Sequence, residues 1–173
     1  MTGEIRSLLV LGGARSGKSR YAQSVVEQSG KTRIFIATAQ PGDGEMAARI
    51  ATHKAERGPD WRTIEAPLLL DAALRQAMAA DTIVLVDCLT LWLSNLMFAS
   101  GRNIDVDIEN MLGAAERSQA AIILVTNEVG CGIVPEHPLA RDFRDRAGLL
   151  NQRAAARAEE IYWMVFGHPL RVK

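Results

Sequence analysis

The sequence is poor in cysteine, in excess charge and in long apolar runs. Its only two cysteines, Cys88 and Cys131, do not form the spaced set of a disulfide framework, so we expect a reduced, cytoplasmic protein. Lys plus Arg and Asp plus Glu both number 20, and this balance argues against nucleic acid or an anionic membrane as the main partner. The longest apolar stretch, residues 89–99, is interrupted and shorter than the roughly 20 residues that span a bilayer. We therefore expect a small-molecule partner, no export signal and no membrane span.

The chain also has no internal repeat and no linker long enough to separate domains. Its 173 residues, 48% of them hydrophobic, suffice for one well-buried core, so residues 1–173 are expected to form a single domain. Short aliphatic runs alternate with longer segments of helical period, which is typical of an α/β fold with a mostly parallel central sheet and helices on both faces.

The expected strands occupy residues 7–11, 33–37, 61–65, 82–86, 121–126 and 161–166. The expected helices occupy residues 18–28, 45–57, 68–79, 91–99, 104–118 and 139–158. A short strand at residues 170–172, after a Gly-His-Pro turn at 167–169, would pair antiparallel at one edge. In such a sheet ligands bind at the carboxyl ends of the strands, which gives a spatial criterion for judging the polar motifs.

A phosphate-binding loop follows the first expected strand. The sequence Gly-Gly-Ala-Arg-Ser-Gly-Lys-Ser at residues 12–19 fits G-x-x-x-x-G-K-[ST], between an apolar run and a plausible helix. Glycines let the backbone N–H groups turn toward phosphate oxygens, and the helix N-terminus favours an anion. The cofactor-binding candidates here are Gly12, Gly13, Ala14, Arg15, Ser16, Gly17, Lys18 and Ser19. Lys18 would reach the β- and γ-phosphates and Ser19 would hold Mg²⁺; the alternative is a glycine-rich turn with a chance lysine.

A single carboxylate ends the buried strand predicted at residues 82–86. Asp87 stands where a Walker B acid would hold Mg²⁺ beside the phosphate loop, although an acid after a strand is often only a turn former. The adjacent Cys88 has no positively charged sequence neighbour and is interpreted as a structural thiol.

The helix expected at residues 45–57 carries a polar stripe. Glu45, Arg49, His53 and Arg57 recur every fourth residue. Flanking arginines would keep the imidazole of His53 neutral and nucleophilic, and could neutralise phosphate oxygens during its attack on phosphorus. An exposed helix face with ordinary ion pairs explains the same spacing, and spacing alone does not decide between the two.

Polar residues also follow the strand expected at residues 121–126. Thr126, Asn127 and Glu128 either orient a metal-bound water or substrate hydroxyl, or only cap the turn. The charged run at 141–146 is typical of a solvated helix surface, with arginines that reach phosphate or a neighbouring subunit as the alternative. His137 is interpreted as a loop residue and His168 as a turn residue, and neither has the partners of a zinc site.

These motifs together resemble one family. The matching segments are residues 12–19, Ile-Ala-Thr-Ala-Gln at 36–40, Glu-Met-Ala-Ala-Arg-Ile at 45–50 with His53 and Arg57, Trp-Arg-Thr-Ile-Glu at 61–65, Val-Thr-Asn-Glu-Val-Gly at 125–130 and Arg-Asp-Phe-Arg-Asp at 141–145. The family is the bifunctional adenosylcobinamide kinase / adenosylcobinamide-phosphate guanylyltransferase of cobalamin biosynthesis, and the resemblance runs nearly end to end.

The resemblance implies two reactions that use GTP, ATP and Mg²⁺. The hydroxyl of the aminopropanol arm of adenosylcobinamide receives a γ-phosphoryl group, and a histidine, here His53, then takes GMP from GTP and passes it to adenosylcobinamide phosphate. Catalytic roles are thus implied for His53, Lys18 and Asp87. The implied nucleotide contacts beyond the loop are Ala37, Thr38, Ala39, Lys54, Ala55, Glu56, Arg57, Glu65 and Asp87. A RecA-like sheet and a homotrimer with sites between subunits are also implied.

The sequence departs from the family in two places. Thr52 stands where some relatives carry a second histidine, and Asp87 stands where some have glutamate. The sequence contains no Asn-Lys-x-Asp element that would indicate a preference for guanine. The choice between ATP and GTP as phosphoryl donor stays open. Two alternatives remain: an enzyme with only the kinase step, and a RecA-like regulatory ATPase that transfers phosphate to water.

Overall fold

The computed structural model describes residues 5–42, 44, 48, 51–52, 54–55 and 57–173. One sheet of seven strands runs through it, in the order β3-β2-β4-β5-β1-β6-β7. The strands are β1 (Ser7–Gly12), β2 (Thr32–Ala37), β3 (Trp61–Glu65), β4 (Thr82–Asp87), β5 (Ala121–Asn127), β6 (Glu160–Val165) and β7 (His168–Arg171). Neighbouring strands are parallel except for β7, which pairs antiparallel with β6. The α/β fold and the antiparallel edge strand are therefore confirmed.

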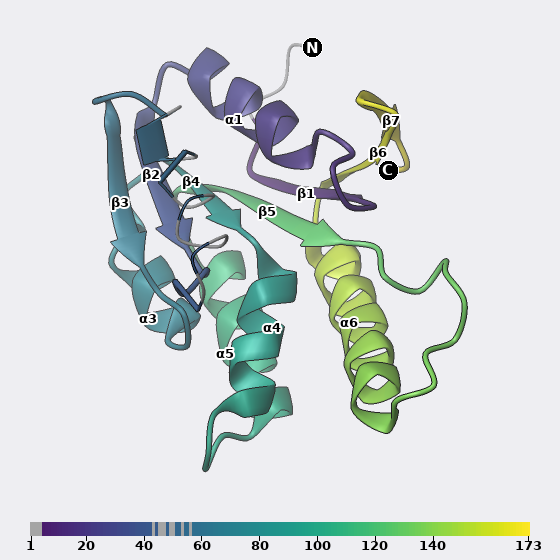
Figure 1. Ribbon diagram of the computed structural model, residues 1–173. Helices are drawn as coiled ribbons and strands as arrows, with labels where there is room; N and C mark the ends of the chain where they lie inside the picture. Colours follow the sequence, from purple (N-terminus) through teal and green to yellow (C-terminus); the bar gives the residue numbers. More distant parts are fainter. Residues whose placement is uncertain (1–4, 43, 45–47, 49–50, 53, 56) are drawn as a thin grey trace.

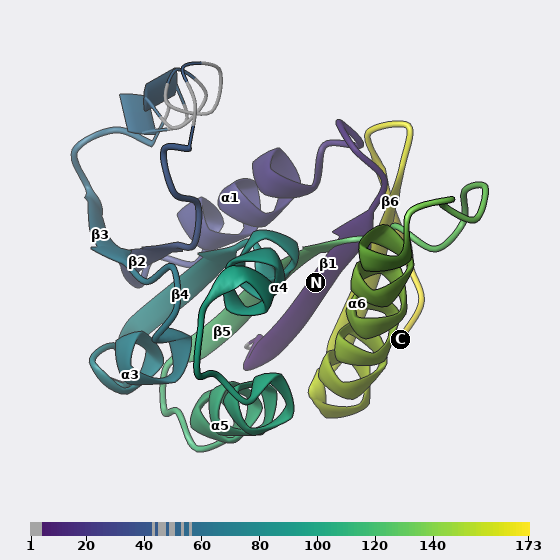
Figure 2. The ribbon, with the colours of Figure 1, turned by 60° about the horizontal axis from the view of Figure 1, so that its bottom comes forward.

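Helices cover both faces of the sheet (Figures 1 and 2). One face carries α1 (Lys18–Gln28), and the other carries α3 (Leu70–Arg75), α4 (Leu89–Phe98), α5 (Ile104–Glu116) and α6 (Pro138–Arg157). Side chains of a strand alternate between the two faces, so Leu8 and Val10 pack toward α1 while Leu9 packs toward the four helices. The central strands β1, β4 and β5 are therefore apolar along nearly their whole length and buried on both faces, as is typical of a parallel sheet.

Three strands extend one residue beyond their expected ends, because the added residue of each pairs with a neighbouring strand. β1, β4 and β5 include Gly12, Asp87 and Asn127, which take part in the register pairs Gly12↔Asn127 and Ala37↔Asp87. The prediction of a helix at residues 68–79 was too long, since α3 has only six residues. The carbonyl of Leu68 accepts a hydrogen bond from the Trp92 indole at 2.9 Å, which holds the chain outside the helix at that point.

The hairpin between β6 and β7 corrects another expectation. His168 is the first residue of β7, paired with Val165, so the turn consists of Phe166 and Gly167 rather than residues 167–169. Of the helix expected at 45–57, residues 45–47, 49–50, 53 and 56 lie outside the described residues. Among the helices that the structure describes, none combines the length and apolar character needed to cross a bilayer.

Candidate active site

The phosphate loop leaves β1 at a glycine that nothing larger can replace. Gly12 has φ +154°, and a Cβ there would lie 2.8 Å from both the Met164 carbonyl oxygen and Ser16 Oγ. Gly17, with φ +91°, is the N-cap of α1. Both fixed glycines of the motif therefore occupy conformations that side chains rarely adopt. Since the first turn of α1 holds no acidic residue, its free N–H groups and positive dipole end suit an anion.

Lys18 folds back over this loop. Its ammonium group donates hydrogen bonds to the Gly13 carbonyl oxygen at 2.5 Å and to Ser16 Oγ at 3.4 Å. The side chain is buried although the residues around the loop tip, 13–15, are exposed. The positive charge is thus held within the loop, beside the backbone groups expected to bind phosphate, and Ser19 follows it half-buried at the start of α1.

The sheet register brings candidates from three other strands to the same edge. Ala37 at the end of β2 pairs with Glu65 of β3 on one side and with Asp87 of β4 on the other. Asp87 is half-buried, as suits a carboxylate that must reach a ligand at the rim. Because all these strands are parallel to β1, their carboxyl ends and the phosphate loop lie at one edge of the sheet, where ligands of such folds bind.

Thr38, the next residue after β2, serves as a clamp between strand ends. It is fully buried, its hydroxyl donates to the Cys88 carbonyl oxygen, and the Cys88 N–H donates to the same hydroxyl, both at 2.8 Å. The Asn95 amide donates to the Thr38 carbonyl oxygen at 2.8 Å. The hydroxyl is therefore committed to Cys88, and sequence reasoning did not find this clamp because its partners are about 50 residues apart. The half-buried Ala39 follows it along the rim.

The structure agrees with the interpretation of Cys88 as a structural thiol. Its sulfur accepts a hydrogen bond from the Leu91 N–H at 3.5 Å and so caps α4, which begins two residues earlier than expected. Burial, reinforced by the neighbouring Asp87 charge, raises the pKa of the Cys88 thiol to about 11. Such a thiol is poorly nucleophilic at neutral pH, whereas Cys131 is exposed.

The polar end of β5 is a hydrogen-bonded network. Thr126 donates to Asn151 Oδ1 at 2.7 Å, and the Asn151 amide donates to the Asn127 carbonyl oxygen at 3.0 Å. The Asn127 N–H donates to Thr90 Oγ1 at 2.7 Å, so the network joins α4, β5 and α6. The Glu128 carboxylate accepts a hydrogen bond from the Gly130 N–H. These contacts favour the turn-capping interpretation for Thr126 and Glu128, and Thr90 is a member that the sequence did not reveal.

The histidine stripe is the part of the site that the structure does not describe. His53, Arg49, Glu45 and Glu56 lie outside the described residues, whereas Lys54 and Ala55 are exposed. Arg57, the last residue of the helix expected at 45–57, lies in a turn and is only 9% exposed, with its guanidinium carbon 3.6 Å from the centroid of the Phe35 ring, so the exposed-face alternative does not hold for this residue. Its long side chain packs on the aromatic face because a guanidinium stacks well there.

The charged run at 141–146 agrees with the solvated-surface interpretation, since Arg146 pairs with Asp142 at 2.9 Å and Arg141 donates to the Pro135 carbonyl oxygen at 3.0 Å. Further along α6, Arg153 pairs with Asp105 at 2.9 Å and Arg157 with Glu109 at 2.7 Å, so these two cations face α5. Arg144 donates to the Gly130 carbonyl oxygen at 2.8 Å and supports the loop after β5. His137 is the N-cap residue of α6, as expected of a loop residue.

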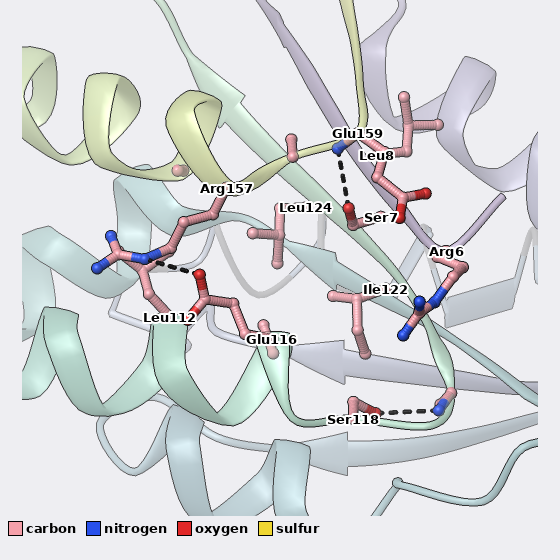
Figure 3. Close-up of a pocket in the computed structure, with 14 residues that line it drawn as sticks. Arg6, Ser7, Leu8, Leu112, Glu116, Ser118, Ile122, Leu124, Arg157 and Glu159 are labelled. Atoms are coloured by element: carbon pink, nitrogen blue, oxygen red, sulfur yellow. Dashed lines mark hydrogen bonds and ion pairs between the residues drawn. The ribbon is translucent and has the colours of Figure 1, made fainter.

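A pocket of about 260 Å³ lies at the opposite end of the sheet (Figure 3). It is formed by the starts of β1 and β5 and the ends of α5 and α6, with an apolar floor that includes Leu112, Ile122 and Leu124. Arg157 pairs with Glu116 at its rim, 3.2 Å between Nε and Oε1. None of the candidate nucleotide-binding residues lines it, so the candidate site is the rim at the carboxyl ends and not this pocket.

Comparison with protein families gives one match that covers almost the whole chain. The family model CobU, described as cobinamide kinase / cobinamide phosphate guanyltransferase, matches residues 8–172. The protein described as bifunctional adenosylcobalamin biosynthesis protein CobP from Pseudomonas aeruginosa is 48% identical over 95% of this chain and 96% of its own length. The corresponding protein CobU from Salmonella typhimurium is 44% identical over 96% of this chain and 99% of its own length.

Solved structures that resemble the chain share its fold at low identity. The flagellar accessory protein FlaH from Methanocaldococcus jannaschii has a TM-score of 0.54 and 14% identity, over 99% of this chain and 81% of the other. The RadB recombinase has a TM-score of 0.52 and 14% identity, over 92% and 74%. These likenesses support the fold alone, and the fold is that of a RecA-like P-loop NTPase.

Proposed function

Because this chain belongs to the cobinamide kinase / cobinamide phosphate guanyltransferase family, we propose that its guanylyl transfer passes through a GMP group bonded to His53. The chain is a bifunctional enzyme of cobalamin biosynthesis: it phosphorylates adenosylcobinamide and then converts the product to adenosylcobinamide-GDP. One observation supports nucleotide binding in both steps: the phosphate loop, which connects the end of β1 to the start of α1.

In the kinase step the phosphate loop binds the nucleoside triphosphate. Backbone N–H groups of residues 13–19, at the start of α1, bind the phosphates, and Lys18 stabilises the charge that develops on the transferred group. The substrate hydroxyl forms a bond to the γ-phosphorus, the bond from that phosphorus to the bridging oxygen breaks, and the nucleoside diphosphate leaves. Positioning and charge stabilisation supply most of such catalysis.

Ser19 and Asp87 fit a magnesium ion by the chemistry of their donors. A hydroxyl and a carboxylate are hard oxygen ligands, and Mg²⁺ at such sites takes one or two protein oxygens with phosphate oxygens and waters completing its shell. Both residues lie at the same edge of the sheet, one at the start of α1 and one at the end of β4. The ion would neutralise phosphate charge there.

In the second step the His53 imidazole attacks the α-phosphorus of GTP. A nitrogen–phosphorus bond forms and the bond to the β-phosphate oxygen breaks, releasing pyrophosphate. An oxygen of adenosylcobinamide phosphate then attacks the same phosphorus, and the nitrogen–phosphorus bond breaks. Arg49, four residues before His53, is the candidate to offset phosphate charge, since the Arg57 guanidinium packs over the Phe35 ring. Lys54, Ala55, Glu56 and Glu65 are proposed contacts of the nucleotide.

The chain has three histidines, and this offers matched controls. The protein is incubated with GTP and Mg²⁺ and weighed intact. We expect a GMP-sized adduct, labile to acid, that is absent from His53→Ala and retained by His137→Ala and His168→Ala. An adduct that survives in His53→Ala would contradict the proposal, and so would the absence of any adduct from a protein active in guanylyl transfer.

We also infer a homotrimer, in keeping with the family resemblance. Large apolar side chains are exposed around the start of α6 and the end of α4, among them Phe98, Ile133, Val134 and Leu139. Exposed apolar patches of this kind mark interaction surfaces. Light scattering on the eluting protein should give three times the chain mass of 18.9 kDa, and the mass of a monomer would contradict the inference.

A further inference from the structure

The side chain of Asn127 takes no part in the hydrogen-bonded network at the end of β5. Its backbone does, because the N–H donates to Thr90 and the carbonyl oxygen accepts from the Asn151 amide. Among the described residues, the Asn127 side chain has one hydrogen-bond contact, from Nδ2 to the Cys88 sulfur at 4.0 Å, and a thiol sulfur is a weak acceptor. A half-buried amide on a fixed backbone is therefore available to a ligand.

The Asn127 side chain lies on the face of the sheet that α1 covers. Ile123 and Val125 of β5 pack in the apolar cluster to which α1 contributes Ala22 and Val26. Because side chains alternate between the two faces of a strand, the side chain of Asn127 lies on the same face as those of Ile123 and Val125. The phosphate loop leads into α1, so this is also the face on which the loop is proposed to bind phosphates (Figure 1).

Asp87 lies on this face as well, since Leu85 of β4 belongs to the same apolar cluster. In the sheet, β5 lies between β4 and β1. The register pairs Asp87 with Val125 on one side of β5, and Gly12 with Asn127 on the other. Asn127 therefore lies between the strand that ends in the proposed metal ligand and the strand that leads into the phosphate loop.

The terminal phosphate of a bound nucleoside triphosphate is expected at this position. Lys18 and Ser19 begin α1, whereas Asp87 ends β4. A triphosphate that is bound by the loop, with its terminal phosphate toward Asp87, passes over the end of β5, which lies between the two. A nucleoside diphosphate ends one phosphate earlier, among the N–H groups of the loop. The amide of Asn127 is thus placed to contact the γ-phosphate but not a diphosphate.

We propose that the side-chain amide of Asn127 donates a hydrogen bond to an oxygen of the γ-phosphoryl group, and is a catalytic residue of the kinase step. The proposal rests on the nucleotide binding proposed above and adds the residue that distinguishes a triphosphate from a diphosphate. A donor on a fixed backbone holds the γ-phosphoryl group for attack by the substrate hydroxyl and offsets charge on its oxygens without reorganisation. The bonds formed and broken are those of the kinase step given above, and the amide exchanges no proton.

The test compares nucleotides with and without a γ-phosphate. Titration calorimetry measures the affinity for ADP and for a non-hydrolysable ATP analogue with an imido bridge between the β- and γ-phosphorus, each with Mg²⁺. A hydrogen bond to a charged group is lost in Asn127→Ala, so we expect it to bind the analogue about 10- to 150-fold more weakly, with ADP affinity unchanged. Asn127→Asp has the same shape but repels phosphate, and should lose more. Asn110→Ala, at an exposed asparagine of α5, should change neither affinity.

The two reactions of the enzyme provide a second readout. The kinase kcat of Asn127→Ala should fall about 100-fold or more, as for the removal of one hydrogen-bond donor to developing charge. The amount of GMP adduct formed at saturating GTP should equal that of the wild type, because attack on the α-phosphorus does not transfer the γ-phosphoryl group. A merely structural role of Asn127 would lower both.

Three results would overturn the proposal. Wild-type affinity of Asn127→Ala and Asn127→Asp for the analogue would show that the amide does not contact the γ-phosphoryl group. An equal loss of ADP affinity would show that Asn127 supports the phosphate loop and does not recognise the terminal phosphate. Failure of the wild-type chain to bind either nucleotide would instead contradict the nucleotide binding by the phosphate loop on which the proposal rests.

Discussion

Thr38 and Cys88 form two hydrogen bonds with each other, one in which the Thr38 hydroxyl donates and one in which it accepts, both 2.8 Å long. Through this pair the end of β2 is fixed to the end of β4, where Ala37 and Asp87 are neighbours. The candidate site is thus positioned by side chains that follow the strands as well as by the strands themselves.

Thr38→Val should destabilise the protein, because valine has nearly the shape of threonine but leaves the buried Cys88 N–H without a partner, while the Cys88 carbonyl keeps the hydrogen bond from the Trp92 N–H. An unsatisfied buried group costs about 1–3 kcal/mol, so we expect the free energy of unfolding in urea to fall by at least that amount. Thr38→Ser keeps the hydroxyl and should lose less. Equal stability of the Val variant and the wild type would contradict the structural role assigned to the clamp.

Gly12→Ala should disrupt the phosphate loop, whereas Gly13→Ala should be tolerated. A methyl group on Gly12 would lie 2.8 Å from a backbone oxygen, while one on Gly13 meets no atom within 4 Å. We expect a clearly lower melting temperature and weak ATP binding for Gly12→Ala. The unfavourable backbone conformation alone should cost about 1–3 kcal/mol. If the two variants have the same melting temperature, the close contact with Met164 does not determine the conformation of the loop.

Asp87→Asn should impair catalysis more than folding. The substitution removes the charge that would hold Mg²⁺, and we expect the kinase kcat to fall about 100-fold or more, as for the loss of one key electrostatic contact. Asp81→Asn provides the control, because Asp81 is an exposed residue just before the other end of the same strand. Kinase rates measured across a range of Mg²⁺ concentrations check this, and an active Asp87→Asn enzyme would exclude Asp87 as a metal ligand.

The two thiols should differ sharply in reactivity. Cys131 is exposed, whereas burial raises the pKa of Cys88 to about 11 and shields its sulfur. Since the thiolate is the reactive form, a thiol reagent at neutral pH should modify one cysteine per folded chain quickly and the second only after unfolding. Rapid modification of Cys131→Ala would show that Cys88 is accessible.

Much of the fold was predictable from the sequence because local pattern and tertiary structure agree. The helix Lys18–Gln28 and the strand Trp61–Glu65 have the expected bounds. In both, a change of pattern coincides with a physical boundary: the helix begins directly after the left-handed Gly17, and the strand is followed by Ala66 and a proline. The phosphate loop was predictable for the same reason, since its glycines are required by geometry.

The remainder depends on contacts that sequence spacing does not reveal. α3 begins two residues later than expected, where Trp92, 24 residues away, binds the Leu68 carbonyl. Arg57 was expected at the end of a helix but lies in a turn and packs over Phe35, a residue of β2. The turn at Phe166–Gly167 was placed one residue too late, because proline and glycine alone do not predict an aromatic residue with positive φ. The first two differences reflect tertiary contacts that override local preference.

The central claim, a covalent GMP intermediate on His53, is tested most directly by its chemical competence. The protein is labelled with GTP carrying a labelled α-phosphate, freed of nucleotide and mixed with adenosylcobinamide phosphate alone. We predict that the label leaves the protein and appears in adenosylcobinamide-GDP within a single turnover, and that addition of pyrophosphate instead regenerates GTP. A labelled protein that does not pass GMP to either acceptor, while the unlabelled enzyme turns over normally, would contradict this account.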